Sequence, residues 1–165
     1  MTGREPAAAA QSPARGPAAE SAPVVVLTSV SSDAHTWNLV FLQLLMEEHG
    51  AHVVNLGACV PDEEVLAACR ENRPDLLVVS SVNGHGATDG ARLARRLRAE
   101  FDRAELPAVI GGKLGVTGTA DAEAIGSGLR QAGYDAVFQD ADLDGLVSYL
   151  RLCAPATPRA LEAGQ

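Results

Sequence analysis

The sequence Val24-Val-Val-Leu-Thr-Ser-Val30 runs directly into Ser31-Ser-Asp-Ala-His35, and this junction decides the fold class. Seven mostly apolar, β-prone residues predict a buried strand. Asp33 and His35 then lie just beyond its carboxyl end, which is where open α/β sheets bind their ligands. An aspartate that accepts a hydrogen bond from one imidazole nitrogen orients the other nitrogen, as is usual for metal-ligating histidines. The same Asp-x-His pattern also fits a capped helix start, so the rest of the chain has to separate the two interpretations.

The composition narrows the class of protein. The chain has 165 residues, enough for one domain with a real core, and a formal net charge of −8, which argues against nucleic acid and anionic membranes as partners. The basic cluster at 92–98 lies beside apolar helix positions and is interpreted as a solvated outer face. Cys59, Cys69 and Cys153 show no Cys-x-x-Cys spacing, which favours a reduced, cytoplasmic protein. No apolar run is long enough to span a membrane.

Strand and helix patterns alternate between two segments of low complexity. Residues 1–22 are rich in Ala, Pro, Gly and Ser and are expected to form a disordered extension; residues 153–165 are expected to form a flexible tail. Residues 23–152 then form the domain. Five strands interleaved with five helices predict a doubly wound parallel sheet of α/β class, with the flavodoxin-like order 2-1-3-4-5. The expected strands are 24–30, 52–56, 76–80, 108–110 and 136–138, and the expected helices are 39–50, one opening at Pro61, 90–101, 122–132 and 143–152.

Three loops of this sheet meet at one rim, because the first, third and fourth strands are neighbours. Glycines there permit the close approach of a ligand or a positive φ, although glycines and serines also simply end strands. Their convergence favours a ligand site. The residues at these three strand ends are Asp33 and His35, Ser80 and Ser81, and Gly111 and Gly112.

At these positions the chain resembles the cobalamin-binding domain family, and within it the small subunits of glutamate mutase. The family motif D-x-H-x-x-G is followed by S-x-L and then by G-G. The resemblance extends over residues 23–152, including the stretches EEHGAHVVNLGACVPDEEVLAAC and RPDLLVVSSVNGHGATDG. The matching positions here are Asp33-Ala34-His35-Thr36-Trp37-Asn38, Ser80-Ser81-Val82 and Gly111-Gly112.

The resemblance implies a role for each of these residues. His35 would be the lower axial ligand of cobalt through Nε2, and Asp33 would hold the Nδ1 proton. The displaced nucleotide tail of the cofactor would enter a slot beside the sheet. The residues implied in binding the cofactor are Asp33, Ala34, His35, Thr36, Trp37, Asn38, Ser80, Ser81, Val82, Gly111, Gly112, Lys113, Leu114, Gly115 and Val116.

Two positions depart from the family pattern. Asn38 replaces the last glycine of the first motif, where its side chain would either crowd the nucleotide tail or hydrogen-bond to it. Val82 replaces a leucine, which is a mild change of volume. Trp37, the only tryptophan, is expected to pack in the core rather than to cover the slot. His85, between two glycines, would face the corrin or a partner, or would simply be a polar loop residue.

The resemblance implies an adenosylcobalamin-dependent carbon-skeleton mutase that converts L-glutamate to 3-methylaspartate. The chain would bind the cofactor, a larger barrel-type subunit would bind the substrate, and the chain alone would have no turnover. Another carbon-skeleton mutase remains open, because the partner carries the substrate site. A flavin carrier of the flavodoxin type is disfavoured, because Asp33 would repel a phosphate and only 4% of residues are aromatic. A phospho-receiver domain needs an acceptor aspartate where Ser80 stands.

Overall fold

The computed structural model describes residues 22–115, 119–139 and 142–156. Five parallel strands form one sheet in the order β2-β1-β3-β4-β5, which confirms the expected doubly wound topology. The strands are β1 (Val24–Ser29), β2 (His52–Asn55), β3 (Leu76–Ser81), β4 (Ala108–Gly112) and β5 (Ala136–Gln139). The helices are α1 (Trp37–Glu48), α2 (Asp62–Asn72), α3 (Gly86–Glu100), α4 (Thr119–Ala132) and α5 (Leu143–Leu152). The expected extension at 1–22, apart from its last residue, and most of the expected tail lie outside the described residues.

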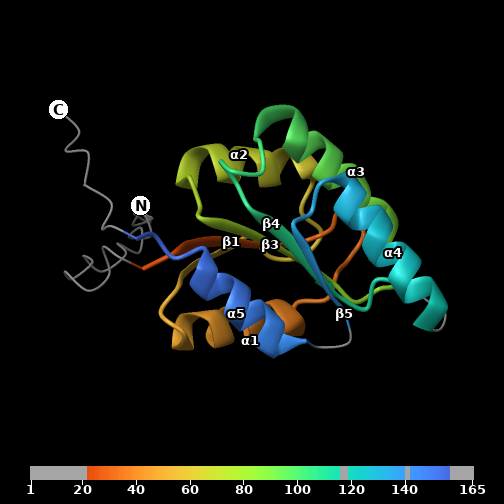
Figure 1. The fold of residues 1–165 in the computed structure, drawn as a ribbon, viewed down its shortest axis with the longest axis horizontal. Coiled ribbons are helices and arrows are strands. Elements are labelled where there is room, and N and C mark those ends of the chain that lie inside the picture. The colour runs from red at the N-terminus through yellow and green to blue at the C-terminus, as the bar shows by residue number, and fades with distance from the viewer. Residues whose placement is uncertain (1–21, 116–118, 140–141, 157–165) are drawn as a thin grey trace, which may run out of the picture.

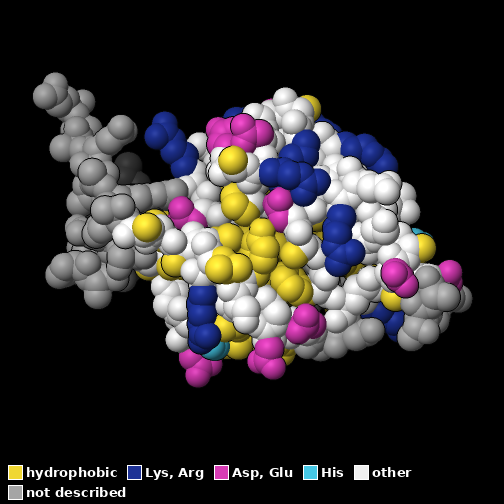
Figure 2. Space-filling view, viewed as in Figure 1, with side chains coloured by type: hydrophobic (Ala, Val, Ile, Leu, Met, Phe, Trp, Pro, Cys, Tyr) yellow, Lys and Arg dark blue, Asp and Glu magenta, His cyan; other side chains and the backbone are white. Residues whose placement is uncertain are grey.

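The sheet is the middle layer of three. Helices α1 and α5 lie on one face, and α2, α3 and α4 lie on the other (Figure 1). All residues of β1 and β3 are buried, as expected for strands covered on both faces. β5 is an edge strand and is only half-buried. In the space-filling view of the same side, apolar side chains gather in the middle of the face, and acidic and basic side chains are interspersed around them (Figure 2).

Register brings the ends of β1, β3 and β4 together. Ser29 pairs with Ser80, and Ser80 pairs in turn with Gly111. Because α1 packs on β1 and β2 while α5 packs on β5, the carboxyl ends of β3 and β4 lie between these two helices on that face. The rim expected from the sequence therefore forms.

Helix α3 begins four residues earlier than expected, at Gly86 instead of Gly90. Glycine is a poor helix former, so the sequence pattern favoured a loop here. The structure gives the reason for both glycines: an added Cβ would lie 2.7 Å from Ser81 Cβ at position 86, and 2.5 Å from Ile110 Cδ1 at position 90. The helix needs glycine to approach the sheet this closely.

The arginines of α3 divide between two environments. Arg92 and Arg96 are exposed and pair with Asp62, so the expectation of a solvated face is confirmed for these two. It is wrong for Arg98, whose side chain is only 15% exposed and donates to the carbonyl oxygen of Gly133 at 2.8 Å.

None of the helices within the described residues has the length and apolar character needed to cross a membrane.

Candidate functional site

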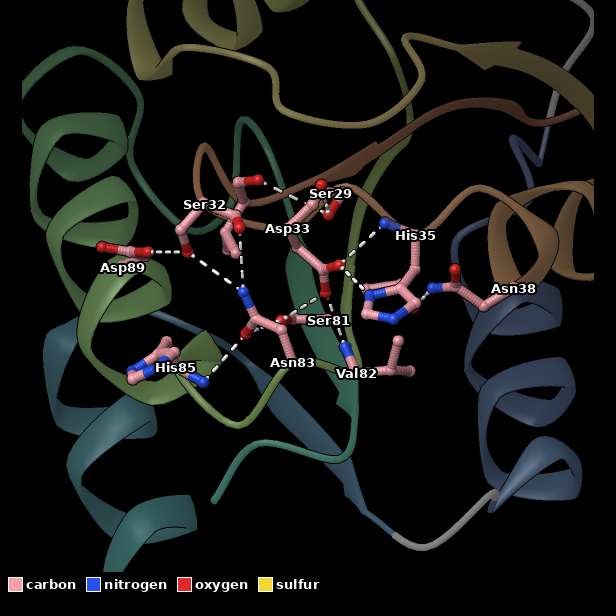
Figure 3. Close-up of polar contacts among 12 residues, drawn as sticks. Ser29, Ser32, Asp33, His35, Asn38, Ser81, Val82, Asn83, His85 and Asp89 are labelled. Carbon is pink, nitrogen blue, oxygen red and sulfur yellow. Dashed lines mark hydrogen bonds and ion pairs between the residues drawn. The ribbon is translucent and has the colours of Figure 1, made fainter. Parts of the chain in front are cut away.

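The carboxylate of Asp33, in the loop after β1, is fully buried and joins two strand ends (Figure 3). Its Oδ1 accepts hydrogen bonds from the backbone N–H of His35 at 3.0 Å and contacts the imidazole Nδ1 of His35 at 2.6 Å. Its Oδ2 accepts from the hydroxyl of Ser81 at 2.9 Å and from the N–H of Val82 at 2.7 Å. Both oxygens are thus occupied, one by the loop after β1 and the other by the end of β3.

Opposing effects set the charge of this carboxylate. Burial favours the neutral acid, but the hydrogen bonds from the N–H groups of His35 and Val82 and from the side chains of His35 and Ser81 outweigh it and lower the pKa of Asp33. An ionised Asp33 accepts the Nδ1 proton of His35, and in the neutral imidazole this tautomer leaves Nε2 with its lone pair. The His35 side chain is 50% exposed, so this nitrogen is accessible at the rim. A neutral, oriented imidazole of this kind is suited to ligate a metal.

Asn83, which the sequence did not single out, connects the loops on the other side of Asp33. Its Nδ2 donates to the carbonyl oxygen of Ser32 at 3.1 Å, and its Oδ1 accepts from the N–H of His85 at 2.8 Å. Figure 3 shows the His85 ring at the start of α3, with Asn83 and Asp33 between it and His35. The structure therefore does not bring His85 to His35.

A cavity of about 390 Å³ lies beside this rim, between α1, α5 and the carboxyl ends of β3 and β4. A volume of this order is typical of small-molecule sites. Most of its walls are apolar, with polar side chains at a few points. The lining residues are Trp37, Asn38, Phe41, Leu42, Val78, Val79, Ser80, Val82, Val109, Gly111, Gly112, Lys113, Phe138, Asp142, Leu143 and Leu146.

Most of the residues implied by the family resemblance lie at this cavity or beside it. Seven line it: Trp37, Asn38, Ser80, Val82, Gly111, Gly112 and Lys113. Asp33 and His35 form the pair next to it, and Ala34 and Thr36 are exposed on the same loop.

Three further implied residues, Ser81, Leu114 and Gly115, also do not line the cavity. Ser81 points to Asp33. Leu114 is buried in the core on the opposite face of the sheet, and a Cβ at Gly115 would lie 2.5 Å from Ile125 Cδ1 of α4. Val116 lies outside the described residues.

Trp37 is 66% exposed, so the expectation that it packs in the core is wrong. Its ring borders the cavity at the first residue of α1. Val40, Phe41 and Leu44 are also exposed and follow it at helical spacing, so that α1 is apolar on its outer side as well as on its core side. A helix with two apolar sides gives no sequence signal for which one is buried, and this is why the expectation failed.

The two glycines at the end of β4 are needed for different reasons. Gly112 has a φ of +109°, and a Cβ there would lie 2.1 Å from the carbonyl oxygen of Ser81. Gly111 has no such φ, but a Cβ would lie 2.8 Å from the carbonyl oxygen of Phe138 on β5. The close approach at these positions is therefore to neighbouring strands.

Asn38 is 94% buried, with 6% of its surface exposed, although it is polar and lines the cavity. Its Nδ2 donates to the hydroxyl oxygen of Ser80 at 2.8 Å. Its Oδ1 is buried without a hydrogen-bond partner among the described residues. The sequence identified Asn38 as unusual, and the structure shows that one end of its amide is unsatisfied.

Helix α5 and the end of β5 supply one side of the cavity, which sequence reasoning missed. Phe138, Asp142, Leu143 and Leu146 all line it. In sequence they read as an ordinary strand end and an amphipathic helix. Only the crossover that returns α5 to the α1 face brings them to the site.

Comparison with known proteins places these features in a family. The family model described as "B12 binding domain" matches residues 23–126. A glutamate mutase sigma subunit of Halobacterium salinarum is 35% identical over 116 residues, covering 70% of this chain and 76% of that protein. Glutamate mutase sigma subunit 1 of Haloarcula marismortui is 34% identical over 122 residues, covering 73% and 77%.

A solved structure shares the fold. The cobalamin-binding protein from Desulfitobacterium hafniense DCB-2 superposes with a TM-score of 0.63 at 21% sequence identity, over 81% of this chain. This chain spans 60% of the length of that one. At this identity the likeness concerns the fold alone.

Proposed function

Since this chain belongs to the B12-binding domain family, we propose that it binds adenosylcobalamin and is the cobalamin-binding subunit of a glutamate mutase. The observation that carries the proposal is the 2.6 Å contact between Asp33 and His35 at the rim of a mostly apolar cavity. The family match supports the cofactor, and the names of the curated relatives support the reaction.

The residues at the rim are suited to ligate cobalt. His35 would hold the metal through Nε2, because Nδ1 is occupied by Asp33 and the ring is half-exposed. Asp33 would fix the tautomer and the direction of the ring and raise the electron donation from Nε2. The hydrogen bonds from Ser81 and Val82 would keep Asp33 in place while it does so.

The cavity fits the nucleotide end of the cofactor. Val78, Val109 and Leu146 would provide apolar contact for a heteroaromatic base, while Asn38 and Ser80 offer polar groups at the wall. Gly111, Gly112 and Lys113 would line this slot directly. Leu114 and Gly115 would act by packing the loop from behind.

The chemistry would be divided between two proteins. When bound, adenosylcobalamin supplies a cobalt–carbon bond whose homolysis starts radical reactions. This chain would hold the cofactor, and a larger barrel-type subunit would bind L-glutamate and seal the site from water. We therefore expect L-glutamate to be rearranged to 3-methylaspartate only when both subunits are mixed, with no turnover by this chain alone. We expect the complex to be cytoplasmic.

Titration of the purified chain with adenosylcobalamin tests the proposal. The wild-type protein should convert the visible spectrum from the base-on to the histidine-ligated form, and ¹⁵N-histidine labelling should change the hyperfine splitting of the Co(II) form in paramagnetic resonance. His35→Ala should bind more than roughly 100-fold more weakly, since loss of a group that only orients a ligand already costs roughly 10–100-fold. His49→Ala is the matched control, because His49 is exposed at the far end of α1. Absence of histidine coupling, or equal binding by His35→Ala, would refute the proposal.

A further inference from the structure

Asn38 carries a hydrogen-bond acceptor that the protein itself leaves unused. The side chain is almost completely buried, its Nδ2 is bound to Ser80, and its Oδ1 has no partner among the described residues. Both residues line the cavity between α1 and α5. A buried acceptor without a donor is costly, so its presence at the wall of a cavity points to a donor from a ligand.

Rotation of the amide does not remove the problem. If Oδ1 and Nδ2 were exchanged, the Ser80 hydroxyl would donate to Oδ1, and Nδ2 would be the unsatisfied atom instead. In the orientation observed, Ser80 accepts from Asn38 and keeps its own proton as a donor. The two side chains therefore offer an acceptor and a donor next to each other, and the complementary ligand group is one that both donates and accepts, such as a hydroxyl.

We propose that Asn38 and Ser80 form a polar anchor for the nucleotide end of the corrinoid, in which Asn38 Oδ1 accepts a hydrogen bond from a hydroxyl of that nucleotide. The inference rests on the proposed function and deepens it. Asn38 is buried at the wall of the cavity, whereas His35 is half-exposed at the rim, where it would hold the macrocycle. The anchor consequently contacts the nucleotide and not the corrin ring, and it makes the chain selective for corrinoids that carry the nucleotide.

The alternative is that Asn38 only occupies space. The cobalamin-binding family keeps a glycine at this position, and an added side chain narrows the slot. The two interpretations predict opposite signs for the same substitution. Asn38→Gly removes the acceptor and the bulk together, so it weakens binding if the amide is an anchor and strengthens binding if the amide is an obstruction.

The test is the affinity of the ligand-free chain for adenosylcobalamin and for nucleotide-free adenosylcobinamide. Trp37, the only tryptophan, borders the cavity, so quenching of its emission reports binding independently of enzyme activity. Asn38→Leu and Asn38→Gly should each bind adenosylcobalamin roughly tenfold more weakly than the wild type, as expected for loss of one hydrogen bond. Both variants should bind adenosylcobinamide as the wild type does.

Three results would overturn the anchor: unchanged adenosylcobalamin affinity in Asn38→Gly, tighter binding by Asn38→Gly, or an equal loss with both corrinoids. Far-UV circular dichroism checks the fold of each variant, and Asn38→Gly decides the matter if the bulkier Asn38→Leu fails to fold. Failure of the proposed function gives a different result, because the wild-type chain would then bind neither corrinoid.

Discussion

Replacing Asp33 should show how much each of its two carboxylate oxygens contributes to the free energy of unfolding. In Asp33→Asn, one oxygen remains and an NH₂ group takes the place of the other. We expect the oxygen to face Ser81 and Val82, because the N–H of Val82 is half-buried, while His35 is more exposed and can turn to water. The variant then loses only the contacts to His35, and the free energy of unfolding should fall by about 1 kcal/mol.

Asp33→Ala removes both oxygens and should cost more. Ser81 has an alternative acceptor in Asn83 Oδ1 at 3.2 Å, so the N–H of Val82 is the main donor left without a partner. Its desolvation, added to the lost hydrogen bonds of a charged group, gives about 2–3 kcal/mol. His35→Ala is the reference variant. It should lower the free energy of unfolding by less than about 1 kcal/mol, because the His35 side chain is half-exposed.

Urea unfolding of the ligand-free chain at pH 7, followed by far-UV circular dichroism, measures all three variants. We expect Asp33→Ala to lower the free energy of unfolding more than Asp33→Asn does. His35→Ala should lower it by no more than Asp33→Asn. An Asp33→Asn variant as unstable as Asp33→Ala would refute this division between the oxygens. So would an Asp33→Ala variant within about 0.5 kcal/mol of the wild type, since that is the range of neutral surface changes.

The remaining predictions concern pH, glycine and cysteine. Because the pKa of Asp33 is lowered in the folded state, its stabilising contribution is present above its ordinary pKa of 3.8 and is lost as the pH falls below that value, through the folded pKa. The stability difference between wild type and Asp33→Asn should therefore shrink in urea titrations carried out below pH 3.8. Gly112→Ala should lower the free energy of unfolding by at least about 2 kcal/mol, because a positive φ and a carbonyl oxygen 2.1 Å from the new Cβ both oppose it. Gly128 lies within α4, where an added Cβ meets nothing, so Gly128→Ala should instead raise the free energy of unfolding by about 0.5–1 kcal/mol. If urea unfolding showed equal changes for Gly112→Ala and Gly128→Ala, this explanation of the two glycines would be wrong. Burial raises the pKa of Cys69 to about 12, so at pH 8 iodoacetamide should modify exposed Cys59 in the folded chain and Cys69 only after unfolding, as peptide mass mapping would show.

The sheet was predictable because its strands are continuous apolar runs separated by helical patterns. Residues 76–80 are buried on both faces and lack alternation, which is typical of a central parallel strand. Short crossovers and right-handed connections then restrict the strand order to few possibilities. The start of α3 was not predictable, since Gly86 and Gly90 lower helix propensity locally. Glycine is required at both positions because the helix lies close to residues of β3 and β4, and these contacts are not visible in the local sequence.

The site was predictable where it depends on neighbouring residues in sequence or on strand ends. The contact of Asp33 with His35 spans two residues, and the closeness of Ser80 to Gly111 follows from the strand order. The environment of Trp37 depends instead on which side of an all-round apolar helix faces the sheet. The unsatisfied oxygen of Asn38 depends on side-chain packing, which no local pattern encodes.

The hydrogen bonds of Asp33 also determine when the site forms during folding. Ser81 and Val82 lie 48 and 49 residues further along the chain, so their donors reach the carboxylate only after β1 and β3 have paired. This long-range pairing has to overcome the entropy of closing the intervening segment. A nascent chain that has emerged only as far as α2 contains the complete Asp-x-His sequence but lacks half of the donors that hold its carboxylate. The imidazole therefore acquires its fixed direction at the same time as the centre of the sheet, and not before.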